Sequence, residues 1–129
     1  VILSEVPELL PAADALLARA ATPAARDAIA ARLDWWRRHA RGRATVLDAP
    51  LDRRAAAAGL LSPAERALDA LDKAGTAPIQ GVVRYAEAAP GPGLWLMDGP
   101  DDDAACTTGQ AAAGATLVVL GTGRGTGFG

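Results

Sequence analysis

The stretch GLWLMDGPDDDAACTTGQAAAGATLVVLGTGRG, residues 93–125, decides the expected fold. It contains two continuously apolar runs, residues 94–97 and 117–120, and each run stops at a polar turn that contains glycine. Continuous apolar runs are typical of strands that are covered on both faces in a parallel sheet. Between the runs, residues 101–103 can start a helix and Gly114 can end it. The stretch therefore predicts a strand, helix, strand unit with a right-handed crossover.

Helices are expected to come before this unit. Residues 1–3, VIL, resemble the end of another strand, and apolar residues then recur at helical spacing over residues 9–20. A second helix is expected after Thr22, with a proline at its first position. A third is expected after Ser62, where SPAE places Glu65 in a capping box. The buried stripe expected for the second helix consists of Ala25, Ile29, Leu33, Trp36 and Ala40.

The remaining segments are less regular. The third helix is expected to bury Leu68 and Leu71 and to end at Gly75. Residues 44–47 could form a short strand, and one short ordered element is expected around residues 82–85.

These elements predict the α/β class, as a Rossmann-like three-layer arrangement with a parallel sheet and helices leading. At 129 residues the chain is expected to form a single domain, 1–129. It opens inside an apolar run and closes on a glycine-rich loop. We therefore expect it to be part of a longer protein, with the sheet incomplete and finished by the remaining domains of that protein.

Composition excludes several classes of function. A net charge of -2 with interspersed signs provides no basic surface for nucleic acid or for an anionic membrane. The single cysteine excludes an internal disulfide and a Cys-rich zinc site, which fits a cytoplasmic protein. No stretch approaches the ~20 apolar residues that cross a bilayer. A homo-oligomer is compatible with the sequence.

A ligand site is expected at the carboxyl edge of the sheet, where open α/β sheets bind their ligands. Asp98 follows the first apolar run, and a glycine-rich loop follows the second. Glu5 and Glu8 would join them if residues 1–3 belong to the same sheet. The loop can bind a carboxylate through backbone N–H groups and a bidentate guanidinium, which suits a polyhydroxy acid. Its residues are Thr122, Gly123, Arg124 and Gly125.

Five blocks of sequence carry a family resemblance: LSEVPE at 3–8, AGTAPIQGVVRYAE at 74–87, GPGLWLMDGP at 91–100, TGQAAAGA at 108–115 and GTGRGTGFG at 121–129. In this order they resemble the carboxy-terminal catalytic region of the altronate and galactarate dehydratase family. The resemblance implies a hydro-lyase that converts a hexonate or hexarate into a 2-keto-3-deoxy acid with a divalent metal, Fe²⁺ or Mn²⁺. The family also includes a relative that eliminates sulfite from sulfolactate.

The resemblance and the residue types together suggest roles. The loop at 122–125 is expected to bind the substrate carboxylate, with Thr108 and Tyr85 as further substrate contacts. Asp98 is expected to act on a hydroxyl or a metal, and Glu5 and Glu8 are the candidate metal ligands. Lys73 and Glu65 are candidates for an acid or base, and the sequence does not identify which group is the base.

The chain also departs from the family pattern. Residues 51–69 keep Glu65 and Arg66 but lose an earlier Glu, a Gly-Asn pair and a closing Gly. DGP replaces DTP, and GTGRG replaces TTGRG. These losses leave open a sulfolactate sulfo-lyase-like activity or a non-catalytic anion-binding or assembly module.

Several conspicuous residues have simpler structural explanations. Glu65 fits a helix cap, and residues 101–103 fit a helix start better than a metal cluster. His39 lies among arginines at a helix end, so it is expected on the surface and a Ser/His/Asp triad is excluded. Cys106 is expected to be a small buried apolar residue. The three tryptophans, Trp35, Trp36 and Trp95, are expected to pack helices and strand together.

Overall fold

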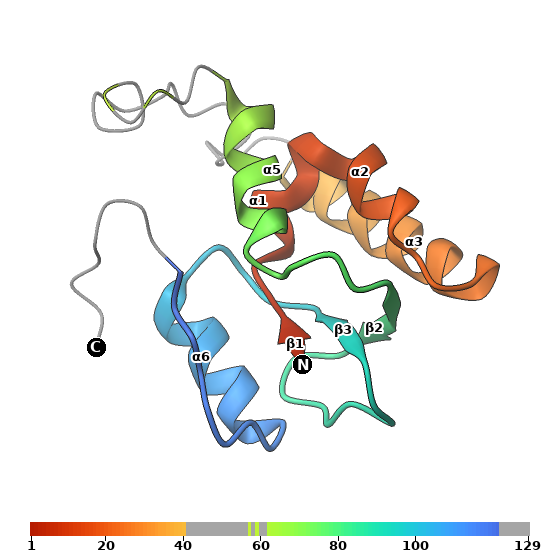
Figure 1. The fold of residues 1–129 in the computed structure, drawn as a ribbon, viewed down its shortest axis with the longest axis vertical. Helices are drawn as coiled ribbons and strands as arrows, with labels where there is room; N and C mark the ends of the chain where they lie inside the picture. Colours follow the sequence, from red (N-terminus) through yellow and green to blue (C-terminus); the bar gives the residue numbers. More distant parts are fainter. Residues whose placement is uncertain (41–56, 58, 60–61, 122–129) are drawn as a thin grey trace.

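The computed structural model describes residues 1–40, 57, 59 and 62–121 (Figure 1). The expected strand at 44–47 and the loop at 122–125 lie outside these residues. In chain order the elements are β1 (Ile2–Leu3), α1 (Val6–Leu9), the 3-10 helix η1 (Leu10–Ala12), α2 (Ala13–Ala18), α3 (Pro23–Ala40), α5 (Pro63–Asp72), β2 (Ile79–Val83), β3 (Leu94–Met97) and α6 (Asp103–Ala112).

The sheet is parallel, with the strand order β1-β3-β2. Ile2 pairs with Trp95 and Leu3 with Leu96, so the first residues of the chain do form a strand beside β3. On the other side of β3, Val83 pairs with Met97. The short element expected around residues 82–85 is β2, which begins three residues earlier, at Ile79. The apolar LWLM run is the central strand, as continuous burial predicts.

Helices cover both faces of the sheet (Figure 1). On one face, Ile79, Leu94 and Leu96 pack into a buried cluster with Ile29 and Leu33 of α3. The same cluster includes residues of α1, η1, α2 and α5. On the opposite face lies α6. The three-layer α/β arrangement is therefore confirmed, with a small sheet that does not close.

The close approach of α6 to the sheet depends on a glycine. A β-carbon added at Gly109 would lie 2.6 Å from Cε2 of Tyr85 and 3.0 Å from Cε of Met97. Tyr85 also donates a hydrogen bond from its hydroxyl to the carbonyl of Ala105, at 2.7 Å. Tyr85 and Met97 thus fix the position of α6 on its face of the sheet.

The first helical region is divided rather than continuous. Helical spacing predicted one helix from residue 9, but helical structure begins at Val6 and passes through α1, η1 and α2. Pro7 and Pro11 lie in the first turns of α1 and η1. Because proline lacks an N–H and clashes with the preceding turn, it favours short helical pieces here. Within the described residues, no helix is both long enough and apolar enough to cross a membrane.

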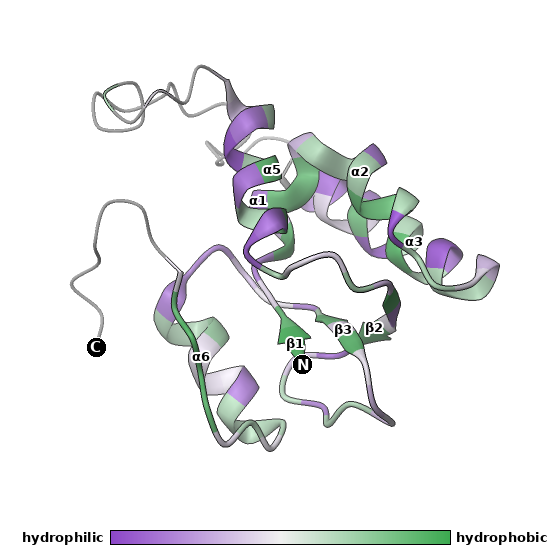
Figure 2. Cartoon of the chain, in the orientation of Figure 1, coloured by the Kyte–Doolittle hydropathy of each residue, from purple (hydrophilic) through white to green (hydrophobic). Residues whose placement is uncertain are grey.

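The expected strand at 117–120 is wrong. These residues are not in a strand, and Leu117 and Val119 are 79% and 82% exposed. Both hydrogen-bonding sides of β3 are already taken by β1 and β2, so the segment cannot pair with β3. It leaves the end of α6 as an apolar extended stretch that runs back beside that helix (Figure 2). It reaches Gly121, where an added β-carbon would lie 3.1 Å from Cδ of Lys73.

Helix α5 begins at the predicted cap. The Ser62 hydroxyl accepts a hydrogen bond from the Glu65 backbone N–H at 3.2 Å and lies 3.1 Å from Oε2 of Glu65. The buried side of α5 consists of Ala67, Ala70 and Leu71. The prediction that Leu68 is buried is wrong: it is 43% exposed, because the smaller alanines face the neighbouring helices.

Ser62→Ala is expected to lower the free energy of unfolding by about 1 kcal/mol, because the Glu65 N–H loses its acceptor. The measurement is urea unfolding of the complete protein. Asp69→Ala is the control on the same helix, since it removes only an exposed ion pair with Lys73 (3.3 Å) and is expected to cost less than about 0.5 kcal/mol. Equal stability of the Ser62 variant and the wild type would show that the cap contributes nothing.

Candidate active site

The site is built where β1 and β3 end side by side. Because Leu3 is paired with Leu96, the residues that follow, Glu5 and Asp98, leave the sheet at the same edge. The Asp98 backbone N–H donates to the carbonyl of Val83 at 2.9 Å, which ties the end of β3 to β2 as well. The backbones of two acidic residues therefore leave neighbouring strands at the carboxyl edge, the usual ligand position in open α/β sheets.

Asp98 is held from the α3 side. Its carboxylate lies 3.0 Å from Nη1 of Arg32 and accepts a hydrogen bond from the Trp36 indole N–H at 2.8 Å. Its side chain is 22% exposed and Arg32 is 31% exposed, so the pair is only partly screened by water. The cationic partner of Asp98 within the described residues is therefore Arg32.

Sequence reasoning missed Arg32 and placed Trp36 only in the helix core. A signal was present, because Trp36 lies on the predicted buried stripe and a buried indole N–H needs an acceptor. Arg32 lies one turn before Trp36 on α3, so the two side chains reach the same carboxylate. Nothing local in the sequence connects them to Asp98, more than sixty residues away.

Glu5 lies in a crowded acidic environment. Its backbone has φ 65° and ψ 52°, the left-handed region that a residue with a side chain rarely adopts. Burial raises the pKa of Glu5 from 4.5 to about 8, with further contributions from Glu8 and then Asp103. Burial and the neighbouring charge of Glu8 also raise the pKa of Asp101. Glu5 therefore holds a proton at neutral pH.

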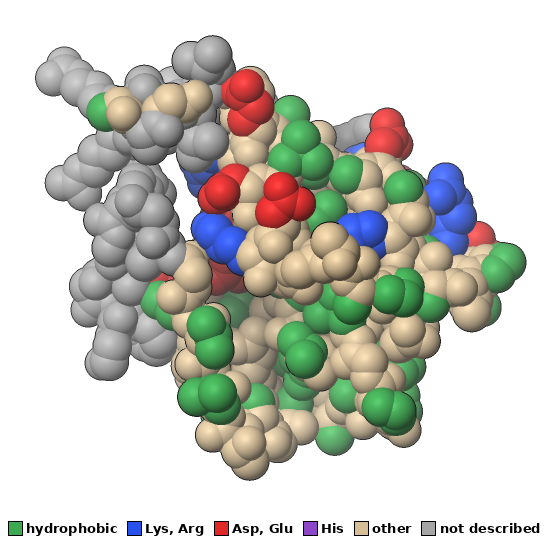
Figure 3. Space-filling view, in the orientation of Figure 1, with side chains coloured by type: hydrophobic (Ala, Val, Ile, Leu, Met, Phe, Trp, Pro, Cys, Tyr) green, Lys and Arg blue, Asp and Glu red, His purple; other side chains and the backbone are tan. Residues whose placement is uncertain are grey.

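The cation beside this cluster is Arg66 of α5. Its Nη2 lies 3.5 Å from Oε1 of Glu8, and both side chains are 23% exposed. Charged side chains gather around α5 and the adjoining end of the sheet, whereas the surface around α6 in this view is mostly apolar and neutral (Figure 3). We call Glu5, Glu8, Asp101 and Asp103 the acidic cluster. Like charges this close favour uptake of either a proton or a cation.

The acidic cluster does not form a complete metal site by itself. Carboxylate oxygens are suitable ligands for Mn²⁺ and Fe²⁺. Across residues 1–40, 57, 59 and 62–121, however, no group of three His, Cys, Asp or Glu side chains is placed to hold a metal ion. Glu5 and Glu8 would need further ligands from other parts of the protein.

The other candidate residues have partners in different places. Glu65 participates in the α5 cap, and Lys73 pairs with Asp69 at the end of that helix. The Thr108 hydroxyl donates to the Ala104 carbonyl within α6 at 2.8 Å. Tyr85 packs against α6, whereas Asp98 turns toward α3. The structure therefore places Glu5 and Glu8 at the edge of the sheet where β3 ends before Asp98. It places Tyr85 and Thr108 on the α6 side.

The structural roles predicted for Cys106, for residues 101–103 and for His39 are confirmed. Cys106 is buried, accepts from the Ser4 hydroxyl at 3.0 Å and donates to the Pro100 carbonyl at 3.0 Å. Asp102 caps α6 by accepting from the Ala105 N–H at 2.7 Å. His39 is exposed, and its ring stacks on Trp35 at a centroid distance of 4.6 Å. These interactions account for the residues structurally.

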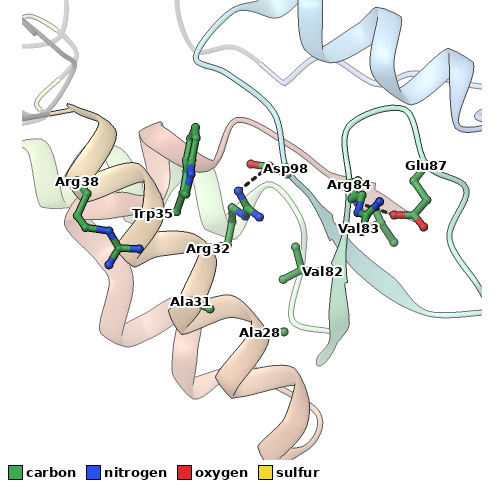
Figure 4. Close-up of a pocket in the computed structure, with 10 residues that line it drawn as sticks. All are labelled: Ala28, Ala31, Arg32, Trp35, Arg38, Val82, Val83, Arg84, Glu87 and Asp98. Atoms are coloured by element: carbon green, nitrogen blue, oxygen red, sulfur yellow. Dashed lines mark hydrogen bonds and ion pairs between the residues drawn. The ribbon is translucent and has the colours of Figure 1, made fainter.

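A pocket of about 350 Å³ opens beside Asp98, between α3 and the end of β2 (Figure 4). Arg32 and Trp35 line it from α3, and Arg84 and Glu87 line it from the turn after β2. Sequence reasoning did not identify this pocket, because its walls come from segments about fifty residues apart.

Comparison with known proteins identifies the family of this chain. Residues 1–129, the whole chain, match the family described as D-galactarate/altronate dehydratase, C-terminal. Over 73 residues the chain is 38% identical to the altronate dehydratase of Escherichia coli (strain K12) and 37% identical to that of Bacillus subtilis (strain 168). Each alignment covers 57% of this chain but only 15% of the relative, so the matched part is a small portion of those proteins. The chain belongs to the D-galactarate/altronate dehydratase C-terminal family.

Proposed function

We propose that the protein containing this chain is a carbon–oxygen hydro-lyase that dehydrates a sugar acid, a hexonate or hexarate, to a 2-keto-3-deoxy acid. The observation that carries the proposal is that Glu5 and Asp98 both follow the carboxyl ends of adjacent paired parallel strands, β1 and β3. Family membership and the names of the two relatives support the substrate class. In this proposal residues 1–129 supply part of the active site.

Such a dehydration needs two proton transfers. A base removes the proton from the carbon next to the substrate carboxylate, the electron pair forms a carbon–carbon double bond, and the hydroxyl on the next carbon leaves with a proton as water. The resulting enol becomes the 2-keto-3-deoxy acid. A group that already holds a proton is needed for the leaving hydroxyl.

We propose that Glu5 donates the proton to the leaving hydroxyl, because its pKa of about 8 keeps its side chain protonated at neutral pH. Asp98 is oriented by Arg32 and Trp36 and accepts hydrogen bonds at the same edge. We therefore propose that Asp98 contacts either the reacting hydroxyl or the C–H group that loses its proton. The cation of Arg32 lies close enough to Asp98 to stabilise negative charge that develops on the substrate.

A divalent metal is the alternative occupant of the acidic cluster. Fe²⁺ or Mn²⁺ would bind through Glu5 and Glu8 with ligands from other parts of the protein, and would supply Lewis-acid stabilisation of the substrate carboxylate. The loop at 122–125 remains the proposed second contact for that carboxylate. Lys73, Glu65, Thr108 and Tyr85 remain proposed contributors of lower priority, since each has a structural partner.

The test is turnover by the complete protein. We expect a 2-keto acid product from galactarate or altronate, measured with and without added Fe²⁺ or Mn²⁺, and no product from residues 1–129 alone. Product from sulfolactate instead, with release of sulfite, would change the substrate class. Failure with all three acids and both metals would leave a non-catalytic binding module and would refute the proposal.

A further inference from the structure

The pocket beside Asp98 has the composition of a binding site. Its apolar lining consists of two alanines of α3, two valines of β2 and the Trp35 side chain. Charged groups are placed around this apolar surface: Arg32, Arg38 and Arg84, with Asp98 and Glu87. Figure 4 shows that Arg84 and Glu87 approach from the side opposite α3. At about 350 Å³ the pocket is at the small end of the range for small-molecule sites.

Among the described residues, Arg84 is the arginine of this pocket whose side chain has no acidic partner, since Arg32 pairs with Asp98 and Arg38 with Asp34. With the described part of the chain, its guanidinium makes no ion pair and no side-chain hydrogen bond. The Arg84 backbone N–H donates to the Glu87 carboxylate at 2.8 Å, and the Glu87 N–H donates back to the Arg84 carbonyl at 3.1 Å. This pair of bonds fixes the turn after β2, so the base of the Arg84 side chain is held in place.

Arg32 is held in place as well. It is paired with Asp98 at 3.0 Å, and its guanidinium carbon lies 5.3 Å from the centre of the Trp35 ring. A guanidinium has five N–H donors, so the contact with Asp98 leaves donors for a ligand. By contrast, Arg38 is exposed and paired with Asp34 at 3.2 Å. Arg32 and Arg84 are therefore the two cations best placed to bind one anion.

The lining selects the class of ligand. A guanidinium fork matches the two oxygens of a carboxylate. Asp98 and Glu87 would repel a multiply charged phosphate, but they can accept hydrogen bonds from hydroxyl groups. The Trp35 indole and the alanine and valine side chains can cover a short carbon chain. This combination fits a small acid that carries hydroxyl groups, and it does not fit a simple inorganic anion.

We propose that this pocket binds the carboxylate end of a polyhydroxy acid, with Arg84 as the principal contact and Arg32 as the second. The identity of that acid as the substrate rests on the proposed function. The pocket adds a carboxylate contact at α3 and β2, which neither the family match nor the names of the relatives assign. Asp98 lies at its edge and joins this subsite to the acidic edge of the sheet.

The first test is calorimetric binding of galactarate to the complete protein. Galactitol, which has the same carbon chain and hydroxyls without the carboxylates, and inorganic phosphate are the comparison ligands. We expect galactarate to bind and the other two to bind at least tenfold more weakly. Arg84→Gln is expected to weaken galactarate binding about ten- to hundredfold. Arg84→Lys should restore part of it, because lysine keeps the charge but not the fork.

Arg37→Gln is the matched control. Arg37 is also an exposed arginine, lies on α3 and pairs with Asp34 at 3.9 Å, but it does not line the pocket. We expect no change in galactarate affinity from Arg37→Gln. A second readout is indole fluorescence: galactarate should change the emission of the wild type, and Trp35→Phe should remove most of that change. Equal affinity of galactarate for the wild type and Arg84→Gln would overturn the inference.

The outcomes also separate this inference from the proposed function. Turnover of galactarate with the same KM in Arg84→Gln as in the wild type would overturn the pocket assignment and leave the hydro-lyase intact. Binding of galactarate that depends on Arg84, without turnover of any acid tested, would support the pocket and refute the hydro-lyase. A raised KM with unchanged kcat in Arg84→Gln supports both.

Discussion

Asp98→Asn is expected to lower kcat for the sugar acid by about 10²- to 10⁴-fold, the range typical of a lost acid–base group. The amide keeps an oxygen that can accept from Trp36, so the side chain should stay in position. The variant loses the negative charge that pairs with Arg32. In our proposal this carboxylate contacts the reacting part of the substrate. The measurement is steady-state turnover of the complete protein with galactarate or altronate.

Stability must be measured for the same variant, because the ion pair with Arg32 is partly buried. We expect Asp98→Asn to cost about 1–2 kcal/mol of unfolding free energy, which leaves the protein folded. Asp34→Asn is the matched control: Asp34 pairs with Arg38 on the surface of α3, and its loss should leave turnover unchanged. Full activity of the Asp98 variant would remove Asp98 from the catalytic machinery.

Glu5→Gln is expected to remove a pH dependence of stability between about pH 4.5 and 8. The folded pKa of Glu5 is about 8, above its ordinary value of 4.5, so the native state binds the proton more tightly than the unfolded state does. Its contribution is complete below pH 4.5 and is lost as pH rises to 8. Because Glu5 is only half-buried, we expect on the order of 1–2 kcal/mol.

The measurement is urea unfolding of wild type and variant at several pH values. Glutamine stays neutral, so the variant should be as stable as the wild type near pH 5 and more stable near pH 8. Glu8→Gln should lower the pKa of Glu5, since Glu8 is its strongest charged neighbour. Turnover of Glu5→Gln at neutral pH should fall about 100-fold if Glu5 protonates the leaving hydroxyl. If the free energy of unfolding depends on pH in the same way in Glu5→Gln and in the wild type, Glu5 does not hold the proton that we assign to it.

Much of the fold could be predicted from local chemistry. Thr22 and Ser62 mark helix starts because their hydroxyls accept from the backbone, at 3.1 Å from Ala25 and 3.2 Å from Glu65. The apolar LWLM run indicated a buried strand, and it is the centre of the sheet. The LVVL run at 117–120 has the same pattern but no strand beside it. Apolar character identifies a segment that can be buried, but only a free neighbour makes it a strand.

The site could be predicted only in part, for a related reason. Parallel strands bring their carboxyl ends to one edge, so the positions of Glu5 and Asp98 followed from the fold. The partners of Asp98 did not, because Arg32 and Trp36 reach it through the packing of α3 on the sheet. The pocket at Arg84 likewise needs the approach of the turn after β2 to α3. Long-range packing of this kind leaves no local pattern in the sequence.

The central claim is that substrate binds where β1 and β3 end together. The most direct measurement is a crystal structure of the complete protein, as the Asp98→Asn variant, with galactarate bound. We predict that the acid lies at this edge, with a hydroxyl within hydrogen-bond distance of residue 98 and a carboxylate at Arg84. Galactarate bound elsewhere, without contact to Glu5, Arg84 or residue 98, would contradict the account.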